Sequence, residues 1–217
     1  MIYNLHIIER DADVVVALTK SDAQNWKKAK RVELIPNFSI MPIKKVSDYE
    51  SKKVIAVGGL EWQKGYDRLI EIWKLVARNH PDWHLEIYGE GELESELKET
   101  ILKVKLCSIS IHPYTNNISM EYATSSICVL TSRYEGFSLL LLETLRHGVP
   151  CITFDCPYGP KDLIDNDKCE FVIDNGNINQ FAEKLCYHID HPEIRKNISI
   201  AAINKAHFYD VDIIMNQ

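Results

Sequence analysis

Short apolar runs rich in β-branched residues alternate with longer segments of helical period along most of this chain. From about Lys53 onward the runs are KVIAV, HLEIYG, SISIHP, ICVLT, PCITFD and EFVI. Strands that alternate with helices in this way pair in parallel, because each helix carries the chain back across the sheet. The alternation therefore predicts an α/β fold built on a doubly wound parallel sheet.

The segment after Gly65 is the clearest helix, and we expect it to end before Pro81. It keeps Asp67 and Glu71 in water and buries one apolar stripe, which consists of Leu69, Ile70, Ile72, Trp73, Val76 and Ala77. A second helix, from about Glu92 to Lys105, is mostly charged. Its sparse apolar stripe suits the outside of a sheet.

The first fifty residues contain one further strand, helix and strand. Their segments are DVVVAL, then TKSDAQNWKKAK with Thr19 or Ser21 as a candidate helix N-cap, then VELIPNF. One such unit cannot enclose a core by itself. We therefore expect a fragment in which residues 1–40 end one α/β domain, 41–52 form a linker, 53–190 form a second domain and 191–217 form a truncated helical segment.

The composition limits the kinds of partner. With 25 Lys and Arg against 31 Asp and Glu, the formal net charge is -6, which argues against binding nucleic acid mainly by charge. The six cysteines form no C-x-x-C pair and several lie in apolar runs, as expected in a reducing, cytoplasmic environment. No apolar run approaches the roughly 20 residues of a membrane span, and the N-terminal residues lack the order of a signal peptide.

The loops that follow the strands are the candidate sites, because open parallel sheets bind ligands beyond the carboxyl ends of their strands. After KVIAV comes GGLEWQKG, where Gly58 and Gly59 allow close backbone approach and Lys64 offers a point charge to a phosphate. A plain turn with a solvated lysine explains this stretch equally well.

Three further loops carry weaker signals. GEGELE places Gly89 and Gly91 around Glu90, but it is not a complete G-x-G-x-x-G motif. In PYTNN, Tyr114 is able to stack on a base, although a half-buried turn tyrosine is the simpler explanation. The loop DCPYGPKDLI has the glycine and prolines of a rigid turn, which we expect to line the same cleft.

The loop SRYEGFS precedes the segment LLLLETLRH, whose end is marked by His147 and Gly148. A helix that begins near Ser138 offers unpaired N–H groups and a partial positive charge to a pyrophosphate. Gly136 removes the side chain that would block the approach. The loop and the start of this helix are therefore a candidate diphosphate site.

Two glutamates bracket the start of this helix. Glu135 lies in the loop before it, and Glu143 lies about a turn and a half inside it with its side chain directed back towards the N-terminus. Each carboxylate can accept hydrogen bonds from hydroxyls on opposite sides of one bound diphosphate, as a sugar nucleotide would offer. The alternative is a Glu135 favoured by the helix dipole and a Glu143 on the surface.

Taken together, four segments resemble the donor domain of retaining glycosyltransferases of the GT-B type, the glycosyl transferases group 1 family. They are VGGLEWQKGYDRLI, IYGEGELESELKE, SRYEGFSLLLLETLRHGVPCITFD and VIDNGNINQFAEKL, and the glutamate pair with seven residues between is that family's signature. The resemblance covers about Val54 to Asp190 and implies a Rossmann-like fold. It also implies that the first fifty residues hold the last unit of the N-terminal acceptor domain. TSRYEGF and FDCPYGPKDLI further resemble bacterial members that build capsular, lipopolysaccharide or exopolysaccharide chains.

The resemblance implies a role for each matching residue. Glu135 would hold hydroxyls of the donor sugar, Glu143 would hold those of the ribose, and Lys64 would meet the diphosphate, so Glu135 and Lys64 are the predicted catalytic residues. Backbone amides would complete the diphosphate site, from Phe137, Ser138, Leu139 and Leu140. The other expected donor-site positions are Gly58, Gly59, Gly89, Tyr114, Arg133 and Gly136.

Two positions depart from the family pattern. The usual arginine of the first loop is replaced by Gly59, which removes one expected phosphate contact unless Arg133 or another cation compensates. The glycine that often precedes the last strand is Glu170 here. The first departure predicts weak donor binding.

The activity implied by the resemblance is transfer of a hexose with retention, without a cofactor or an obligatory metal. UDP is the preferred nucleotide by resemblance alone. The acceptor would be a glycan or a lipid-linked acceptor held by the N-terminal domain, with the full-length protein at the inner face of the cell membrane. We expect the isolated chain to bind nucleotide weakly and to transfer little sugar.

Other functions fit parts of the same pattern. A sugar-nucleotide epimerase would act without an acceptor, and a glycogen-type phosphorylase would need a pyridoxal lysine that the sequence does not reveal. A nucleotide-sugar-binding module without catalysis would explain Gly59. A flavodoxin-like signalling domain would explain the sheet but would leave the glutamate pair and Lys64 without a role.

Overall fold

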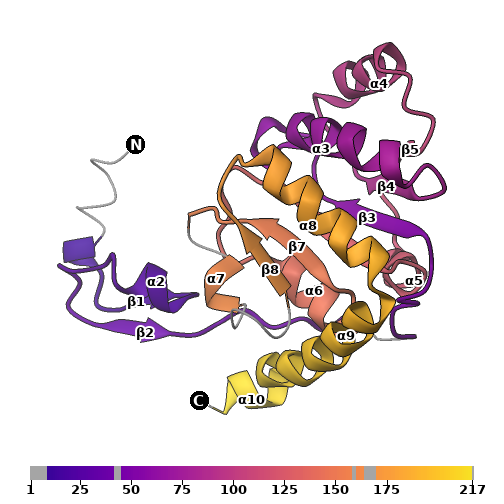
Figure 1. The fold of residues 1–217 in the computed structure, drawn as a ribbon. Helices are drawn as coiled ribbons and strands as arrows, with labels where there is room; N and C mark the ends of the chain where they lie inside the picture. The colour runs from indigo at the N-terminus through magenta and orange to yellow at the C-terminus, as the bar shows by residue number, and fades with distance from the viewer. Residues whose placement is uncertain (1–8, 42–44, 158–159, 164–169, 217) are drawn as a thin grey trace.

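The main body of the molecule is a six-stranded parallel sheet. A computed structural model describes residues 9–41, 45–157, 160–163 and 170–216, and the strand order in this sheet is β5-β4-β3-β6-β7-β8 (Figure 1). Each of the six apolar runs from Lys53 onward forms one strand, as predicted. The strands are β3 (Lys53–Val57), β4 (His84–Tyr88), β5 (Ile109–His112), β6 (Ile127–Leu130), β7 (Cys151–Phe154) and β8 (Glu170–Ile173).

Helices cover both faces of this sheet. On one face, α3 (Tyr66–Asn79) and α8 (Ile178–Asp190) enclose the larger core cluster, in which Trp73 and Phe181 are fully buried. On the other face, Tyr122, Leu141 and Leu163 form a second cluster. They belong to α5 (Ile118–Ala123), α6 (Leu139–His147) and α7 (Pro160–Leu163). This arrangement confirms the doubly wound α/β fold.

Helix α3 buries the face that the sequence predicts. Its buried residues include the expected stripe, except that Ala77 is half-buried. The charged helix expected around residues 92–105 is α4 (Glu94–Lys103), and Leu97 is its only fully buried residue. Both helices begin and end within two residues of the expected positions, because caps and periodicity are local properties of the sequence.

A small unit precedes the main sheet. Strands β1 (Val15–Ala17) and β2 (Val32–Leu34) pair in parallel, with α2 (Lys20–Ala23) between them. Thr19 is the N-cap of α2, since its hydroxyl accepts a hydrogen bond of 3.1 Å from Asp22 N. The helix is much shorter than the twelve-residue segment predicted. Side chains of Asn25 and Trp26 bond to Ser21 O and to Asp22, in competition with a longer helix.

The segment before β3 and the helices after α8 are tied to the main body. Residues 45–52 have no helix or strand, and Ser47 N donates to His147 O at 2.7 Å. Helix α9 (Pro192–Ala206) packs Ala202 against Leu145 of α6, and α10 (Val211–Met215) follows it (Figure 1). A Cβ at Gly148 would lie 2.6 Å from Ser199 Oγ, so the glycine that ends α6 also allows α9 to pack closely against it.

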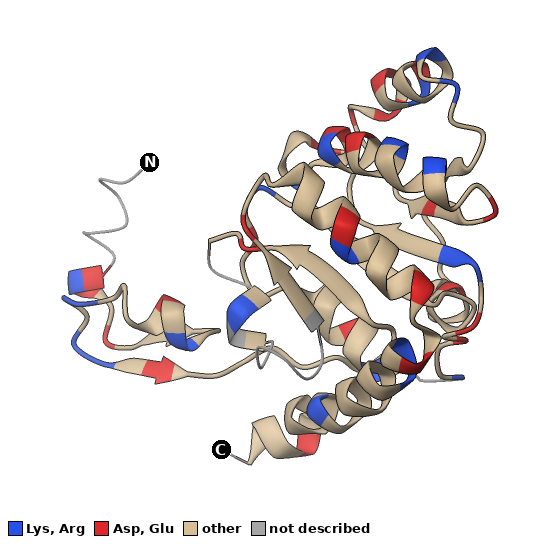
Figure 2. Cartoon of the chain, viewed as in Figure 1, with Lys and Arg blue, Asp and Glu red and all other residues tan. Residues whose placement is uncertain are grey.

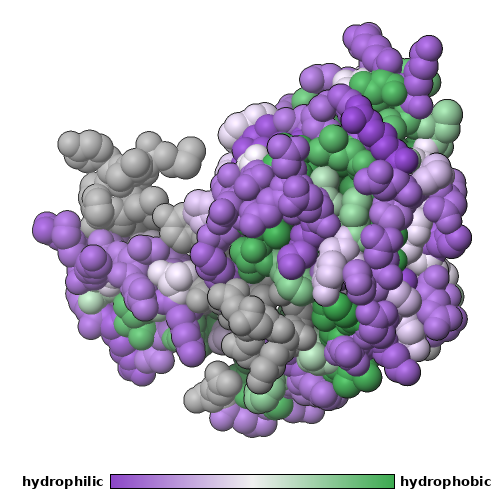
Figure 3. All heavy atoms as spheres, in the orientation of Figure 1, coloured by the Kyte–Doolittle hydropathy of each residue, from purple (hydrophilic) through white to green (hydrophobic). Residues whose placement is uncertain are grey.

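The surface is mixed in charge and polarity. Acidic and basic residues are interspersed along the helices in Figure 2, and Figure 3 shows apolar patches separated by hydrophilic residues. That charge does not drive binding to nucleic acid stays a prediction. No helix in the described part of the chain has the length and apolar character needed to cross a membrane.

The α8 residue His188 is fully buried as a neutral imidazole. Its ring lies edge-on to Phe171 with the centroids 4.5 Å apart. Neither ring nitrogen has a hydrogen-bond partner among the described residues. Burial lowers the pKa of His188 to about 3, and the positive charges of Lys184 and Arg195 contribute to the shift. The folded state therefore excludes the proton that this side chain would otherwise bind below pH ~6.5.

We expect His188 to make the protein sensitive to acid. Its pKa is lower in the folded chain, so the unfolded chain binds more protons and stability is lost as the pH falls from ~6.5 towards 3. At pH ~5 the loss is roughly 2 kcal/mol. His188→Leu should remove this component from the free energy of urea unfolding measured at several pH values. The exposed His84→Gln is the control, and equal pH dependence of the two variants would refute the assignment.

Candidate functional site

The sheet changes its direction of winding between β3 and β6. The chain runs outward from β3 to β4 and β5, then returns to the other side of β3 for β6, β7 and β8. Open parallel sheets bind ligands beyond the carboxyl ends of the strands at such a point. The loops of residues 58–65 and 131–138 follow β3 and β6, and hydrogen bonds join them here.

An ion pair connects these two loops. Lys64 Nζ lies 2.7 Å from Glu135 Oε1, and Ser132 Oγ donates a hydrogen bond of 2.6 Å to the same oxygen. The Glu135 side chain is 8% exposed and that of Lys64 is 23% exposed, so the lysine is the more accessible partner. Attraction between charges is stronger away from bulk water. The ion pair therefore keeps Lys64 and Glu135, the two residues predicted to be catalytic, in contact.

Two glycines and a threonine direct the side chain of Lys64, which ends the short helix η1 (Trp62–Lys64). Gly65 has a left-handed backbone with φ of 67°, and a Cβ there would lie 2.3 Å from the Thr131 carbonyl oxygen. The Thr131 hydroxyl donates to the carbonyl oxygens of Lys64 and Gly65, at 3.1 Å each. A Cβ at Gly58 would lie 3.1 Å from Lys64 Cε. The lysine therefore passes close to Gly58, which makes room for it.

The glycines of GEGELE let two loops pack backbone against backbone. A Cβ at Gly89 would lie 1.9 Å from the Gly58 carbonyl oxygen, and one at Gly91 would lie 2.6 Å from the Leu60 carbonyl oxygen. Leu60 N donates to Glu90 O at 2.9 Å. This packing explains both glycines, and a contact between Gly89 and a ligand stays a prediction.

Helix α6 begins where the sequence predicts. Ser138 is its N-cap, and Ser138 Oγ accepts a hydrogen bond of 3.4 Å from Leu141 N. The amides of Leu139 and Leu140 open the helix and have no partner within it. A Cβ at Gly136 would have none of the described atoms within 4 Å. Within the described part of the chain, the helix start therefore combines backbone donors that lack a partner in the helix with an open approach, as a diphosphate site requires.

The two glutamates line two different cavities. Glu135 and Gly136 line one of about 370 Å³, together with Phe137 and residues of the small N-terminal unit. Glu143 and Tyr114 line another of about 270 Å³, beside Tyr88, Thr115 and Asn116. Tyr114 thus lies near Glu143, although the two are far apart in sequence. The expected base-stacking residue and the expected ribose ligand face the same space.

Tyr122 supports Glu143 from the core. The fully buried Tyr122 hydroxyl donates to Glu143 Oε2 at 3.1 Å. Burial raises the pKa of Glu143, and the hydrogen bond from Tyr122 offsets part of that rise. Sequence reasoning missed Tyr122, since nothing in α5 marks its contact with α6. It also missed Ser132, which lies inside the quoted loop but is of a residue type common in any turn.

Arg133 is already engaged within the chain. Its guanidinium donates two hydrogen bonds to the Asp67 carboxylate, at 2.9 and 2.6 Å, and lies 4.4 Å from the Trp62 ring. A Cβ at Gly59 would meet only the flexible Glu61 side chain, at 3.3 Å. The backbone therefore does not require glycine at position 59. For Arg133 to replace the missing family arginine, its bidentate pair with Asp67 would have to open.

The DCPYGPKDLI loop reaches the site in its described part. Glu135 N donates to Pro157 O at 3.3 Å, so this loop lies beside the predicted catalytic carboxylate, as expected for a cleft-lining segment. Residues 158–159 and 164–169, and the side chain of Glu170, lie outside the described residues. Among described residues, no group of three or more His, Cys, Asp or Glu side chains could hold a metal ion. Metal-free transfer stays a prediction.

Comparisons with known proteins show the family and the fold of this chain. The chain is 34% identical to the amylovoran biosynthesis glycosyltransferase AmsD of Erwinia amylovora, over 95% of this chain and 61% of that protein. It is 30% identical to an uncharacterized glycosyltransferase of Haemophilus influenzae, over 94% of this chain and 60% of that protein. Thus the chain spans about three fifths of the length of these relatives.

The fold agrees with that of a solved glycosyltransferase structure. TarM of S. aureus, crystallised with Fondaparinux, alpha-GlcNAc-glycerol and UDP, superposes with a TM-score of 0.90 at 24% identity, over all of this chain and 45% of that one. The architecture is therefore the Rossmann-like GT-B fold. The family model described as "Glycosyl transferases group 1" matches residues 39–205, and the chain belongs to this family.

We expect Gly89→Ala and Gly136→Ala to differ in stability. A Cβ at position 89 collides with the Gly58 backbone and should cost several kcal/mol, whereas one at position 136 meets open space and should cost less than about 0.5 kcal/mol. Thermal unfolding of the two variants measures the difference. Equal melting temperatures would contradict the packing role of Gly89.

We expect Tyr122→Phe to raise the pKa of Glu143 above its value in the unsubstituted chain. The variant removes the hydroxyl that stabilises the carboxylate and leaves burial to act alone. NMR titration of the Glu143 carboxyl carbon measures the change. Tyr66→Phe is the matched control, because this buried tyrosine bonds to the Gly58 carbonyl oxygen instead. An unchanged Glu143 pKa would refute the coupling.

Proposed function

We propose that this chain carries the donor site of a retaining hexosyltransferase that uses a nucleotide-diphosphate sugar, with UDP as the preferred nucleotide. The acceptor is a glycan or a lipid-linked glycan of a cell-surface polysaccharide. Membership of the family supports the reaction class. AmsD, named for amylovoran biosynthesis, and TarM, crystallised with UDP, support the acceptor class and the nucleotide.

The observation that carries this proposal is the Lys64–Glu135 ion pair at the start of α6. Its position between β3 and β6 is where a parallel sheet binds ligands. A lysine ammonium and two helix-opening amides provide positive charge for a diphosphate. The neighbouring Glu135 carboxylate can accept hydrogen bonds from sugar hydroxyls once a donor is bound. A buried structural ion pair would need neither the open amides nor the adjoining cavity.

A sugar nucleotide matches the two cavities. Its hexose would enter the cavity of about 370 Å³ lined by Glu135, and its nucleoside would enter the cavity of about 270 Å³ lined by Glu143 and Tyr114. Glu143 would then accept hydrogen bonds from the ribose, held in position by Tyr122. The diphosphate would span the helix start between them.

In the proposed reaction the bond between the anomeric carbon and the diphosphate oxygen breaks, and an acceptor hydroxyl oxygen bonds to the same carbon. The proton of that hydroxyl passes to the leaving diphosphate. Negative charge develops on the leaving diphosphate. Lys64 and the amides of Leu139 and Leu140 would stabilise this charge. Glu135 would position the sugar without becoming covalently attached to it. A metal is not part of this proposal.

A nucleotide-sugar-binding module without catalysis is the second candidate, and Gly59 is the observation that favours it. The missing arginine would weaken stabilisation of the leaving group more than recognition of the nucleoside. Loss of transfer with retained UDP binding in Glu135→Ala would favour the enzyme. A wild-type protein that binds UDP and remains inert towards donor and acceptor would favour the module.

We also propose that the protein is cytoplasmic and works at the inner face of the membrane. The scattered cysteines indicate a reducing environment, and a lipid-linked acceptor would lie at that face.

We expect UDP to bind the chain more tightly than GDP, ADP or CDP in calorimetric titrations. Glu143→Ala should weaken UDP binding about tenfold or more, because it removes hydrogen bonds from a charged acceptor. Glu135→Ala should leave UDP binding nearly unchanged and weaken binding of the UDP-sugar. The exposed Glu96→Ala is the control. Equal affinity of wild type and Glu143→Ala for UDP would overturn the assigned site.

A further inference from the structure

The short helix η1, which ends at Lys64, is bonded to the loop that follows β6. Arg133 N donates a hydrogen bond of 2.8 Å to Gln63 O. The Gln63 side chain donates one of 3.0 Å to Tyr134 O in the same loop. These bonds set the backbone immediately before Lys64 against the loop that also carries the predicted catalytic carboxylate.

The side chain of Arg133 contacts the chain on both sides of Lys64. Its Nη1 donates a hydrogen bond of 2.6 Å to Trp62 O, two residues before the lysine. The guanidinium also forms the bidentate pair with Asp67, three residues after the lysine. A bidentate pair fixes the relative orientation of its two partners as well as their distance. Arg133 therefore joins the two ends of the segment that carries Lys64.

Trp62 gives this arrangement a partial shield from water. Its side chain is largely exposed, so packing in the core does not hold it, and its ring lies on the Arg133 guanidinium instead. The Arg133 side chain is only 13% exposed. Cation–π contacts and ion pairs are stronger where water is partly excluded. Burial alone would raise the pKa of Asp67, but the hydrogen bonds and positive charge of Arg133 hold that pKa below its ordinary value.

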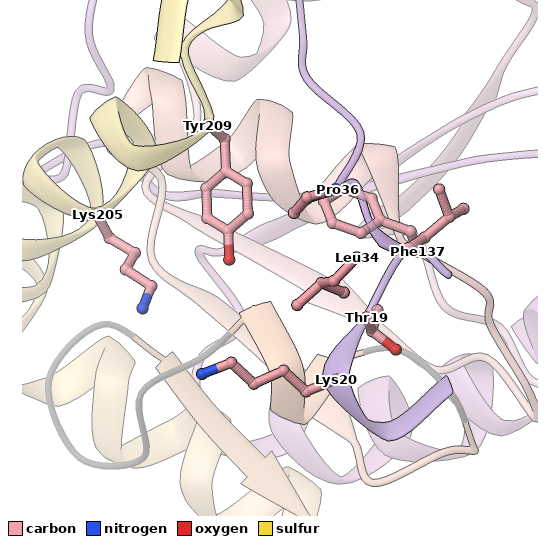
Figure 4. Close-up of a pocket in the computed structure, with 8 residues that line it drawn as sticks. Thr19, Lys20, Leu34, Pro36, Phe137, Lys205 and Tyr209 are labelled. Atoms are coloured by element: carbon pink, nitrogen blue, oxygen red, sulfur yellow. The ribbon is translucent and has the colours of Figure 1, made fainter. Parts of the chain in front are cut away.

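The other cations near the site are directed elsewhere. Among the described residues that line the cavity of Glu135 there is no lysine or arginine. Lys20 and Lys205 line a separate cavity of about 170 Å³ together with Tyr209 (Figure 4). With Arg133 engaged by Asp67, the positive charge offered to a diphosphate depends on where Lys64 points.

We propose that Arg133 is a positioning residue of the donor site, which holds Lys64 in place through Trp62 and Asp67 and does not itself contact the diphosphate. The inference rests on the proposed function, because it takes Lys64 as the residue that meets the diphosphate. It differs from the expectation that Arg133 compensates for Gly59. To reach a ligand, the guanidinium would have to leave its partners and release the segment that carries Lys64.

The test is calorimetric titration of the 217-residue chain with UDP. If Arg133 positions Lys64, Asp67→Asn should weaken UDP binding about threefold, because the bidentate pair loses its charge. If Arg133 contacted the diphosphate directly, the same variant would free the guanidinium and tighten binding. Asp67→Glu keeps the charge and should restore most of the affinity. Glu71→Gln is the control on the exposed side of the same helix and should have no effect.

A double-mutant cycle shows whether Arg133 acts through Lys64. Lys64→Met should weaken UDP binding about tenfold, and Arg133→Met should weaken it about threefold. The double variant should bind UDP as Lys64→Met does, because the position of a lysine that is absent no longer matters. Additive losses would show that Arg133 contacts the ligand independently, and would overturn the proposal.

A second readout does not need UDP. Acetic anhydride acetylates lysines at rates that depend on how accessible and unpaired each amine is, and mass spectrometry measures the extent at each position. Lys64 should react faster in Arg133→Met and in Asp67→Asn than in the wild-type chain. The exposed Lys98 of α4 is the internal control and should react equally in all three. Equal acetylation of Lys64 in all three would overturn the positioning role.

The outcomes separate this proposal from the proposed function. Failure of the wild-type chain to bind UDP would overturn the donor site, and the acetylation of Lys64 would then decide the positioning role by itself. Tighter UDP binding by Asp67→Asn, or unchanged binding by Arg133→Met, would overturn the positioning role and leave the donor site standing.

Discussion

The parallel pairing of β3 with β6 is the constraint on which the site depends. The register sets Val54 opposite Ile127 and Ile55 opposite Cys128, so both strands deliver their following loops to the same place. The two loops are crowded together there, and Gly65 allows their close approach, because only a residue without a side chain fits against the Thr131 carbonyl oxygen. The contact between the loops then determines where Lys64 points. Its ion pair with Glu135 is a consequence of sheet topology as much as of charge.

The two glutamates of the site, Glu135 and Glu143, are held in different environments. Glu135 is held by Ser132 and Lys64 at the junction of two loops. Glu143 is held by Tyr122 from within the core, where burial raises its pKa. Helix α6 links the two environments, because its start carries amides without a partner in the helix and its second turn carries Glu143. In the proposed function, this one short helix would therefore contact both the diphosphate and the ribose of the donor.

Particular residues show how far sequence reasoning reached. The sequence motifs predict the glutamate pair, Lys64 and a helix that begins near Ser138, and the structure brings Lys64 and Glu135 into contact. Gly89 was expected at the donor, yet its packing against Gly58 already requires a glycine. Arg133 was one cation that could compensate for Gly59, and the structure pairs it with Asp67. Both differences arise because a loop sequence does not reveal which other loop it packs against.

The sequence by itself determined the six strands of the main sheet, the positions of α3 and α6, and the membership of a family, because these depend on periodicity, caps and local motifs. Only the tertiary structure decided that Tyr122 supports Glu143, that Tyr114 shares its cavity, and that Arg133 bonds to Trp62 and Asp67. Each of these joins residues that are distant along the chain. Their contacts are set by strand order and helix packing, which no local pattern encodes.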